Sequence, residues 1–133
     1  MQEKFNQKLY NLEEMLVSLE QAVTVSDDGK RFVIDACIRR FRFSFDIIWK
    51  TLQIILLKKY GVQATFPRDV FEKSYQGNLI NNEAIWLAMM TDRNLIPDCY
   101  DNKLANRIHS AIQQSYFPEL KKTFLMLKDR FGN

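Results

Sequence analysis

The segment from Asp92 to Tyr100 carries the side chains best suited to chemistry on a phosphate group. The planar guanidinium of Arg93 can bind a phosphate through two parallel hydrogen bonds. Asp98 follows in the same segment, but an ordinary aspartate has a pKa of about 3.9, so at neutral pH it is a weak base and repels phosphate. Arg93 has a structural alternative, as a residue at a helix end that pairs with Asp92, Asp98 or a backbone carbonyl.

A charged flank on the stretch from Arg31 to Tyr60 is the second candidate surface. Its members carry both signs at steps of three or four residues, which lets opposite charges pair along a helix. They are Asp35, Arg39, Arg42, Asp46 and Lys50. With Trp49 on its border and Arg40 nearby, this flank could form one wall of a cleft that binds the phosphate and base of a nucleotide. The alternative is a salt-bridged face exposed to solvent.

Several common catalytic motifs are absent from the sequence. It contains no GxxxxGKS/T, no GxGxxG after a strand, no GxSxG and no HExxH, and it lacks the Gly-Ser turn with spaced aspartates that holds magnesium in nucleotidyltransferases. Cys37 and Cys99 are far apart and have no CxxC or histidine-rich neighbour, so neither a metal site nor a disulfide is expected. His109 falls on a predicted helix, where we expect it to face solvent or form a hydrogen bond. The chain should not transfer nucleotides by itself.

One long helix over 31–60 should position these residues. Its apolar residues recur at steps of four and three, which places them on one continuous stripe. The stripe consists of Ile34, Ile38, Phe41, Phe45, Ile48, Leu52 and Ile55. Val33, Cys37 and Ile47 widen the apolar arc beyond what one neighbouring helix needs. We therefore expect this helix to be central, with neighbours on more than one side.

Further helices are predicted on both sides of it. A heptad-like stripe predicts a first helix over about 3–24, with Asp27 or Asp28 able to cap the next one. A short helix should begin at Pro67 and stop at Gly77. A fourth helix, apolar nearly all round, should follow a cap at Asn81 or Asn82, and it requires burial on every side, in the bundle or between subunits. Its Met89 and Met90 are either core residues or part of a dimer contact. A fifth should start at Asp101 or Asn102 and be ended or kinked by Pro118. The expected fold is an all-α, antiparallel up-and-down bundle of four to five main helices.

Composition is consistent with one packed domain over residues 1–133. The formal net charge is +3, and the basic pairs are scattered, which is a weak indication of nucleic-acid binding. No apolar run is long enough to span a membrane, and the first residues form a polar amphipathic segment, not a secretory signal. We expect a cytoplasmic protein that does not enter a membrane.

Several short motifs resemble one known family. They are Arg40-Phe41-Arg42-Phe43-Ser44-Phe45-Asp46, Trp49-Lys50-Thr51-Leu52, Pro67-Arg68-Asp69-Val70, Gly77-Asn78-Leu79-Ile80, Asp92-Arg93-Asn94 and Tyr100-Asp101. These residues are similar to the signature of the nucleotidyltransferase substrate-binding proteins, a branch of the HEPN group of helical bundles. Two positions depart from the family pattern: Phe66 replaces the usual serine or threonine before Pro67, and Arg42 replaces a glutamate.

The resemblance implies a non-catalytic subunit of a two-component, toxin–antitoxin-like nucleotidyltransferase. Such a chain binds substrate or nucleotide, forms homodimers, and associates with a separate small nucleotidyltransferase that holds the nucleoside triphosphate and Mg. No cofactor is then expected in this chain. The residues implied for binding of substrate or partner are Arg40, Arg42, Asp46, Trp49, Lys50, Arg93, Asn94 and Tyr100.

The HEPN resemblance also supplies an alternative, a metal-independent ribonuclease toxin that acts on RNA. Its motif is an arginine, four to six residues and a histidine that moves the proton, often followed by tyrosine. Here Arg93 and Tyr100 are kept, and Asp98 stands where histidine belongs, so Arg93 and Asp98 are only candidate catalytic residues. In related pairs the tyrosine of this motif receives adenylate, which makes Tyr100 a candidate acceptor. The alternative is a partly buried tyrosine whose hydroxyl is hydrogen-bonded to a neighbour.

Overall fold

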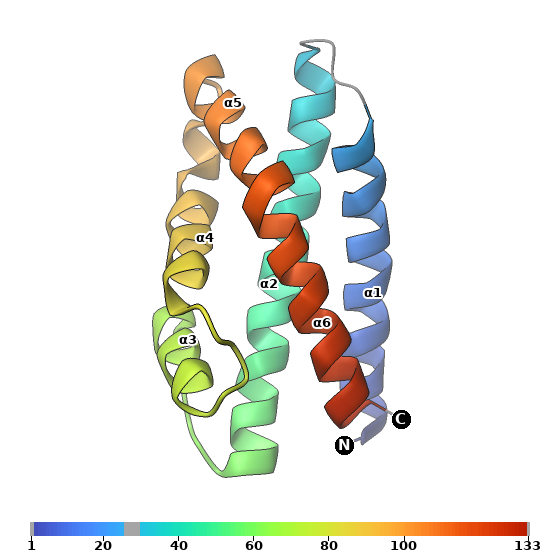
Figure 1. The fold of residues 1–133 in the computed structure, drawn as a ribbon, viewed down its shortest axis with the longest axis vertical. Helices are drawn as coiled ribbons and strands as arrows, with labels where there is room; N and C mark the ends of the chain where they lie inside the picture. Colours follow the sequence, from blue (N-terminus) through green and yellow to red (C-terminus); the bar gives the residue numbers. More distant parts are fainter. Residues whose placement is uncertain (1, 26–29, 133) are drawn as a thin grey trace.

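The computed structural model describes residues 2–25 and 30–132, and over these residues all regular secondary structure is helical. Figure 1 shows α1 and α2 running antiparallel, with α3 and α4 on one flank of α2 and the continuous α5–α6 rod crossing the bundle. The elements are α1 (Gln2–Thr24), α2 (Arg31–Tyr60), α3 (Pro67–Gln76), α4 (Glu83–Leu95), the 3₁₀ turn η1 (Ile96–Asp98), α5 (Asn102–Ala111), the π-helical turn η2 (Ile112–Tyr116) and α6 (Phe117–Phe131). The predicted antiparallel bundle is confirmed.

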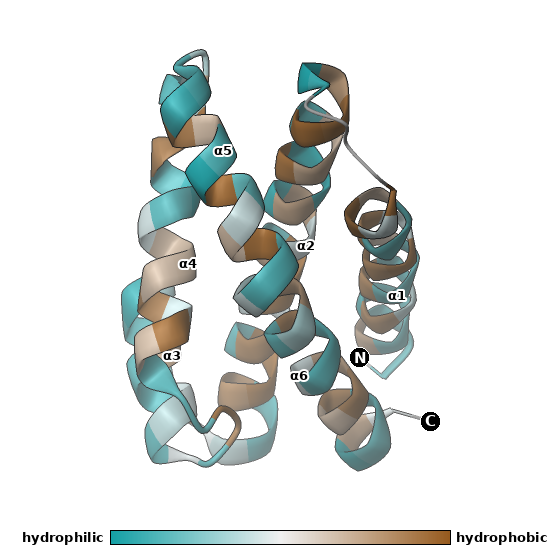
Figure 2. Ribbon diagram, turned by 45° about the horizontal axis from the view of Figure 1, so that its top comes forward, coloured by the Kyte–Doolittle hydropathy of each residue, from teal (hydrophilic) through white to brown (hydrophobic). Residues whose placement is uncertain are grey.

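Helix α2 is the central element, as its wide apolar arc predicts. It contacts α1, α3, α4, α5, η2 and α6. Every residue of the predicted stripe is buried, and so is Cys37, which is fully enclosed. Figure 2 shows brown segments recurring along α1 and α2 with teal ones between them, the pattern of helices that bury one side.

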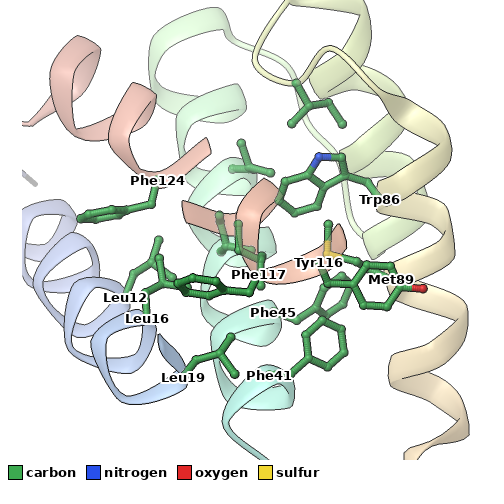
Figure 3. Packing of buried hydrophobic residues seen from close by; sticks show 14 of the residues in the cluster. Leu12, Leu16, Leu19, Phe41, Phe45, Trp86, Met89, Tyr116, Phe117 and Phe124 are labelled. Atoms are coloured by element: carbon green, nitrogen blue, oxygen red, sulfur yellow. The ribbon is translucent and has the colours of Figure 1, made fainter. Parts of the chain in front are cut away.

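The core joins α1, α2, α4 and the α5–α6 rod through aromatic and aliphatic side chains (Figure 3). The Phe41 ring lies 5.4 Å from the Tyr116 ring, and the Phe71 ring lies 5.3 Å from that of Trp86, centroid to centroid. Trp86 is fully buried, and its indole Nε1–H donates to Glu119 Oε2 at 3.0 Å. This pairing satisfies the one polar atom that the large side chain brings into the interior.

Side-chain caps and one glycine set the helix ends. Asn82 accepts a hydrogen bond from the amide of Ile85, and Asp101 accepts from those of Lys103 and Leu104. Gly61 ends α2 in the left-handed conformation with φ 67°. The predicted caps Asp27 and Asp28 lie outside the described residues.

Two expectations concern the shape and burial of helices. The regular α-helix is interrupted next to Pro118, as expected: the π-helical turn Ile112–Tyr116 separates α5 from α6, although the chain stays helical through 102–131. Pro118 stands in the first turn of α6, where its missing amide hydrogen costs least. On α4, Ala84 and Ala88 are exposed within this chain and Asp92 is buried, so the bundle alone covers only part of this helix.

The histidine and the two cysteines discussed in the sequence analysis are buried in the folded chain. His109 is buried on α5 and does not face solvent, and Cys99 is buried, with burial raising the pKa of its thiol. Among the described residues, neither cysteine is part of a disulfide. Across the described part of the chain, no helix combines the length and the apolar character that crossing a membrane demands.

Candidate functional site

A groove lies where the middle of α2, the start of α3 and the end of α4 meet. Its volume is about 440 Å³. It is lined by Phe45, Asp46, Trp49, Lys50, Phe66, Pro67, Arg68, Met90, Arg93 and Asn94. Five residues predicted for binding therefore share one concave surface, namely Asp46, Trp49, Lys50, Arg93 and Asn94.

A two-pronged ion pair forms one wall of this groove. Arg93 on α4 donates from Nε to Asp46 Oδ1 and from Nη2 to Asp46 Oδ2, each at 3.0 Å, and both side chains are 28 % exposed. The pair joins residues 47 positions apart and fixes α4 against α2. Arg93 thus does pair with a carboxylate, but with Asp46 and not with its sequence neighbours Asp92 or Asp98.

The charge that remains in the groove is positive. Asp46 is neutralised by Arg93, while Lys50 and Arg68 form no ion pair with any carboxylate among the described residues. Both cations are exposed at the groove. An anionic ligand would meet them without displacing an existing partner.

Aromatic rings stand beside these cations. Trp49 is half-buried, with Lys50 Nζ 6.0 Å from the centre of its ring. Phe66, the residue before α3, is 71 % exposed, an unusual cost for a side chain of this size. The groove therefore offers two cations and two accessible aromatic faces, the chemistry that binds a phosphate and a planar base.

The structure places the other predicted residues elsewhere. Arg40 donates to the Ser18 carbonyl at 2.8 Å and joins α2 to α1. Arg42 lies over the Phe43 ring, 5.3 Å from its centre. Asp98 and Tyr100 are both exposed around the 3₁₀ turn, and neither lines the groove that contains Arg93.

A buried polar cluster behind the groove was not predicted. Asp92 is 4 % exposed and accepts hydrogen bonds from Tyr116 Oη at 2.6 Å and from Arg107 Nη2 at 2.8 Å and Nη1 at 3.2 Å. The hydrogen bond to Asp92 raises the pKa of Arg107. Burial, followed by the hydrogen bond to Asp92, raises the pKa of Tyr116 and holds its hydroxyl protonated.

Other groove residues were missed for a different reason. Phe45 was assigned only to the core stripe, and Met90 to core or dimer contacts. Phe66 was noted only as a departure from a family motif. The dipeptide Pro67-Arg68 could have indicated Phe66 as a groove residue. A proline that starts a helix fixes the position of the residue before it, and here that residue is exposed.

Comparison with known proteins identifies the family of this chain. The profile of the family described as "Nucleotidyltransferase substrate binding protein like" matches residues 7–129, nearly the whole chain. The chain belongs to this family. The resemblance in its motifs is thereby confirmed, and no curated protein sequence matches it.

Solved structures agree with the family assignment. A protein from Thermus thermophilus superposes with a TM-score of 0.77 at 25 % identity, covering 92 % of this chain and 99 % of that one. A Haemophilus influenzae protein, whose structure is described as revealing the fold of a substrate-binding domain of a nucleotidyltransferase, superposes with a TM-score of 0.65 at 18 % identity, covering 96 % and 99 %. The second likeness shows the shared fold.

Proposed function

We propose that this family member is the non-catalytic, substrate-binding subunit of a two-component nucleotidyltransferase, and that the groove between α2, α3 and α4 holds a phosphate-bearing substrate. The observation that carries the proposal is the composition of the groove. Lys50 and Arg68 are not paired with carboxylates in the described residues, and Trp49 and Phe66 stand beside them.

Each part of a nucleotide has a matching part of the groove. The phosphates would contact Lys50 and Arg68, whose charges no neighbouring carboxylate offsets. The base would stack on Trp49 or Phe66, since aromatic faces bind bases with little preference for sequence. The volume of about 440 Å³ lies within the range of about 300–1,000 Å³ that small-molecule sites occupy.

Catalysis is assigned to a separate small nucleotidyltransferase. Among the described residues, the groove contains no histidine, cysteine or serine, and its one carboxylate, Asp46, is engaged by Arg93. These residue types support binding and orientation of a substrate more than acid–base or nucleophilic catalysis. The nucleoside triphosphate that reacts and its Mg would then be held by the partner, and ATP added to this chain alone serves as a probe for the phosphate and base contacts of the groove.

Fluorescence of the groove tryptophan tests the proposal directly. Titrating the full chain with ATP in the absence of divalent metal should change the emission, and Trp49→Phe should abolish the change because the other tryptophan, Trp86, is fully buried. Lys50→Gln with Arg68→Gln should weaken binding at least about tenfold. Lys103→Gln, a surface change on α5 outside the groove, is the matched control.

A second variant separates a structural from a binding role for Arg93. Arg93→Lys keeps the charge but loses the fork that matches Asp46. If Lys50 and Arg68 contact the phosphate, Arg93→Lys should weaken ATP binding less than Lys50→Gln does. ATP binding that is unaffected by changes at Lys50, Arg68 and Trp49 would contradict the proposal.

Tyr100 supports an additional role in a toxin–antitoxin-like pair, as an acceptor of adenylate from the partner. Its side chain is 84 % exposed beside a short turn, which leaves the hydroxyl open to a second protein. Mass spectrometry after co-expression with the partner should find an adenylate mass on the Tyr100 peptide and none in Tyr100→Phe. An unmodified peptide from an active pair would end this idea.

The arrangement gives less support to a ribonuclease. Arg93 is held by Asp46, and the exposed Asp98 and Tyr100 do not line its groove. Purified protein should therefore leave RNA intact at acidic and neutral pH. Metal-independent cleavage that Arg93→Ala abolishes would favour the ribonuclease instead.

Self-association has support on α4. Ala84 and Ala88 are exposed and Ile85 and Leu87 are only partly buried, so this apolar helix leaves a face uncovered. We propose a homodimer through α4. Light scattering should give twice the mass of the chain at micromolar concentration, and Ala84→Glu with Ala88→Glu should return it to the monomer mass.

A further inference from the structure

A second groove lies between the start of α1 and the end of α2 and shares no residue with the first. Its volume is about 460 Å³. Its floor is apolar, formed by Phe5, Ile54 and Ile55. Its rim is formed by Lys4, Lys8, Lys58 and Lys59, with Gln2 beside them.

The four lysines form two rows that border the apolar floor. Lys4 and Lys8 are four positions apart on α1, so they share one side of that helix. On α2, Lys58 follows Ile54 by four positions and Lys59 follows Ile55 by four. None of the four lysines forms an ion pair with a described carboxylate, and no acidic residue of the described ranges lines the groove. The groove therefore selects an occupant that is apolar and negatively charged.

The apolar seam extends beyond the groove. Helices α1 and α2 are antiparallel. The hydrogen bond from Arg40 to the Ser18 carbonyl shows that these two residues lie opposite each other, at a distance from the groove along the two helices. Between that contact and the groove stand Met15 on α1 and Ile47 on α2, both only partly buried. An occupant lying along the seam can thus continue past the lysines for several helical turns.

The bundle's own α6 packs on a different side of α1. It reaches α1 through Lys128 with Glu13 at 3.3 Å and Lys121 with Glu20 at 3.1 Å. Lys8 and Glu13 are five positions apart, which places them about 140° apart around a helix that turns about 100° per residue. Figure 1 shows α6 crossing one side of the α1–α2 pair. The lysine-bordered groove lies on a different side of α1 from these two ion pairs, and the last residue of α6 reaches its edge, where Gln2 donates to the Phe131 carbonyl at 3.4 Å.

We propose that this groove binds an acidic amphipathic helix of a partner protein. The apolar stripe of that helix would pack on Phe5, Ile54 and Ile55, and glutamates or aspartates flanking the stripe would contact the two lysine rows. Charged residues that border an apolar seam choose partners in coiled coils by the same logic. An elongated helix fits better than a compact anion, because the seam continues toward Met15 and Ile47.

A synthetic peptide provides the test. The probe is a fluorescein-labelled helix of about five turns, with leucines along one stripe and glutamates on both sides of it. Fluorescence anisotropy with the full chain should show binding that weakens with salt. Lys8→Glu with Lys58→Glu, one change in each row, should weaken it at least about tenfold. Lys30→Glu with Lys103→Glu changes the net charge equally outside the groove and should leave binding unchanged.

Two further measurements make the result decisive. A second peptide, with lysines in place of the glutamates, should bind the Lys8→Glu, Lys58→Glu chain better than it binds the parent chain. The Ile54→Ser chain should bind the original peptide more weakly than the parent does, while its circular dichroism spectrum stays native. Equal binding to the rim variant and its control would overturn the proposal. The proposal would also be overturned if the peptide did not bind at concentrations up to about 1 mM. The same holds if the groove bound dodecanoate, a fatty-acid anion, but not the peptide.

Discussion

Replacing Asp92 by alanine should destabilise the folded chain by roughly 3 kcal/mol. Loss of the hydrogen bond from Tyr116 should account for the larger part of this free energy, and loss of the ion pair with Arg107 for the smaller part. The carboxylate is 4 % exposed and accepts from both side chains. The two donors differ in environment. Tyr116 is 5 % exposed, whereas the side chain of Arg107 is 54 % exposed.

The environments set the two magnitudes. A buried hydroxyl that loses a charged acceptor at 2.6 Å forfeits roughly 1.5–3 kcal/mol, because no water replaces the acceptor. An exposed guanidinium can turn into solvent when its partner disappears, so its pair contributes only about 0–1 kcal/mol. Tyr116→Phe should therefore cost roughly 2 kcal/mol and Arg107→Ala less than about 1.

A double-mutant cycle measures these shares. Urea unfolding followed by circular dichroism gives the free energy of unfolding of the parent, of the single variants Asp92→Ala, Tyr116→Phe and Arg107→Ala, and of the two pairs that contain Asp92→Ala. The coupling of Asp92 with Tyr116 should exceed that with Arg107 by about 1 kcal/mol. Phenylalanine keeps the ring that stacks on Phe41, so Tyr116→Phe isolates the hydroxyl.

The reasoning would be refuted by the opposite ranking. If Arg107→Ala destabilised the chain more than Tyr116→Phe, the surface half of the cluster would dominate, and exposure would be a poor guide to its energetics. An Asp92→Ala variant within about 0.5 kcal/mol of the parent would show that the buried hydroxyl finds another acceptor.

Three further predictions follow from single contacts. The raised pKa of Tyr116 keeps its hydroxyl protonated in the folded state. The contribution of this hydroxyl to stability is therefore complete below about pH 10 and is lost as the pH rises from there toward the folded pKa. Urea midpoints between pH 8 and 11 should fall more steeply for the parent than for Tyr116→Phe. Gly61→Ala should lower the free energy of unfolding measured with urea by about 1 kcal/mol. The cost comes from the backbone alone, because φ is 67° and no described atom outside Gly61 and its two chain neighbours lies within 4 Å of an added Cβ. Glu119→Ala should cost roughly 1–3 kcal/mol by leaving the Trp86 indole unpaired, and Glu119→Gln should cost less because it keeps an acceptor.

Each of these predictions has an outcome that contradicts it. Parallel pH profiles for the parent and Tyr116→Phe would mean that this hydroxyl titrates equally in both states. A neutral Gly61→Ala would mean that the end of α2 relaxes out of the left-handed conformation. Equal losses for Glu119→Ala and Glu119→Gln would assign the effect to the charge and not to the indole hydrogen bond.

The fold was predictable because the information for it is local in the sequence. The stripe from Ile34 to Ile55 states which side of α2 is buried, and periodicity needs no knowledge of the neighbours. Asn82 and Asp101 announce helix starts in the same way. Pro118 likewise indicates where the regular α-helix is interrupted, but the proline rule does not reveal that a π-helical turn before it keeps the chain helical.

The site was harder because its contacts join distant parts of the chain. The sequence identifies Arg93 as a residue suited to phosphate, but not that Asp46, 47 positions earlier, engages its fork. Nor does any periodic signal indicate that Asp92 would be buried, since a lone carboxylate on an apolar helix looks like an exposed residue until its donors are known. Arg107 and Tyr116 lie 15 and 24 positions away.

Asp92 and Arg93 together explain why the groove exists before any ligand arrives. They are consecutive, so their side chains leave α4 about 100° apart and reach two different neighbours. Asp92 binds α5 and the π-helical turn through Arg107 and Tyr116, while Arg93 binds α2 through Asp46. The α4 wall is therefore held from two directions. A substrate that enters need not order this wall, so its interactions with Lys50, Arg68 and the two aromatic rings are available for affinity.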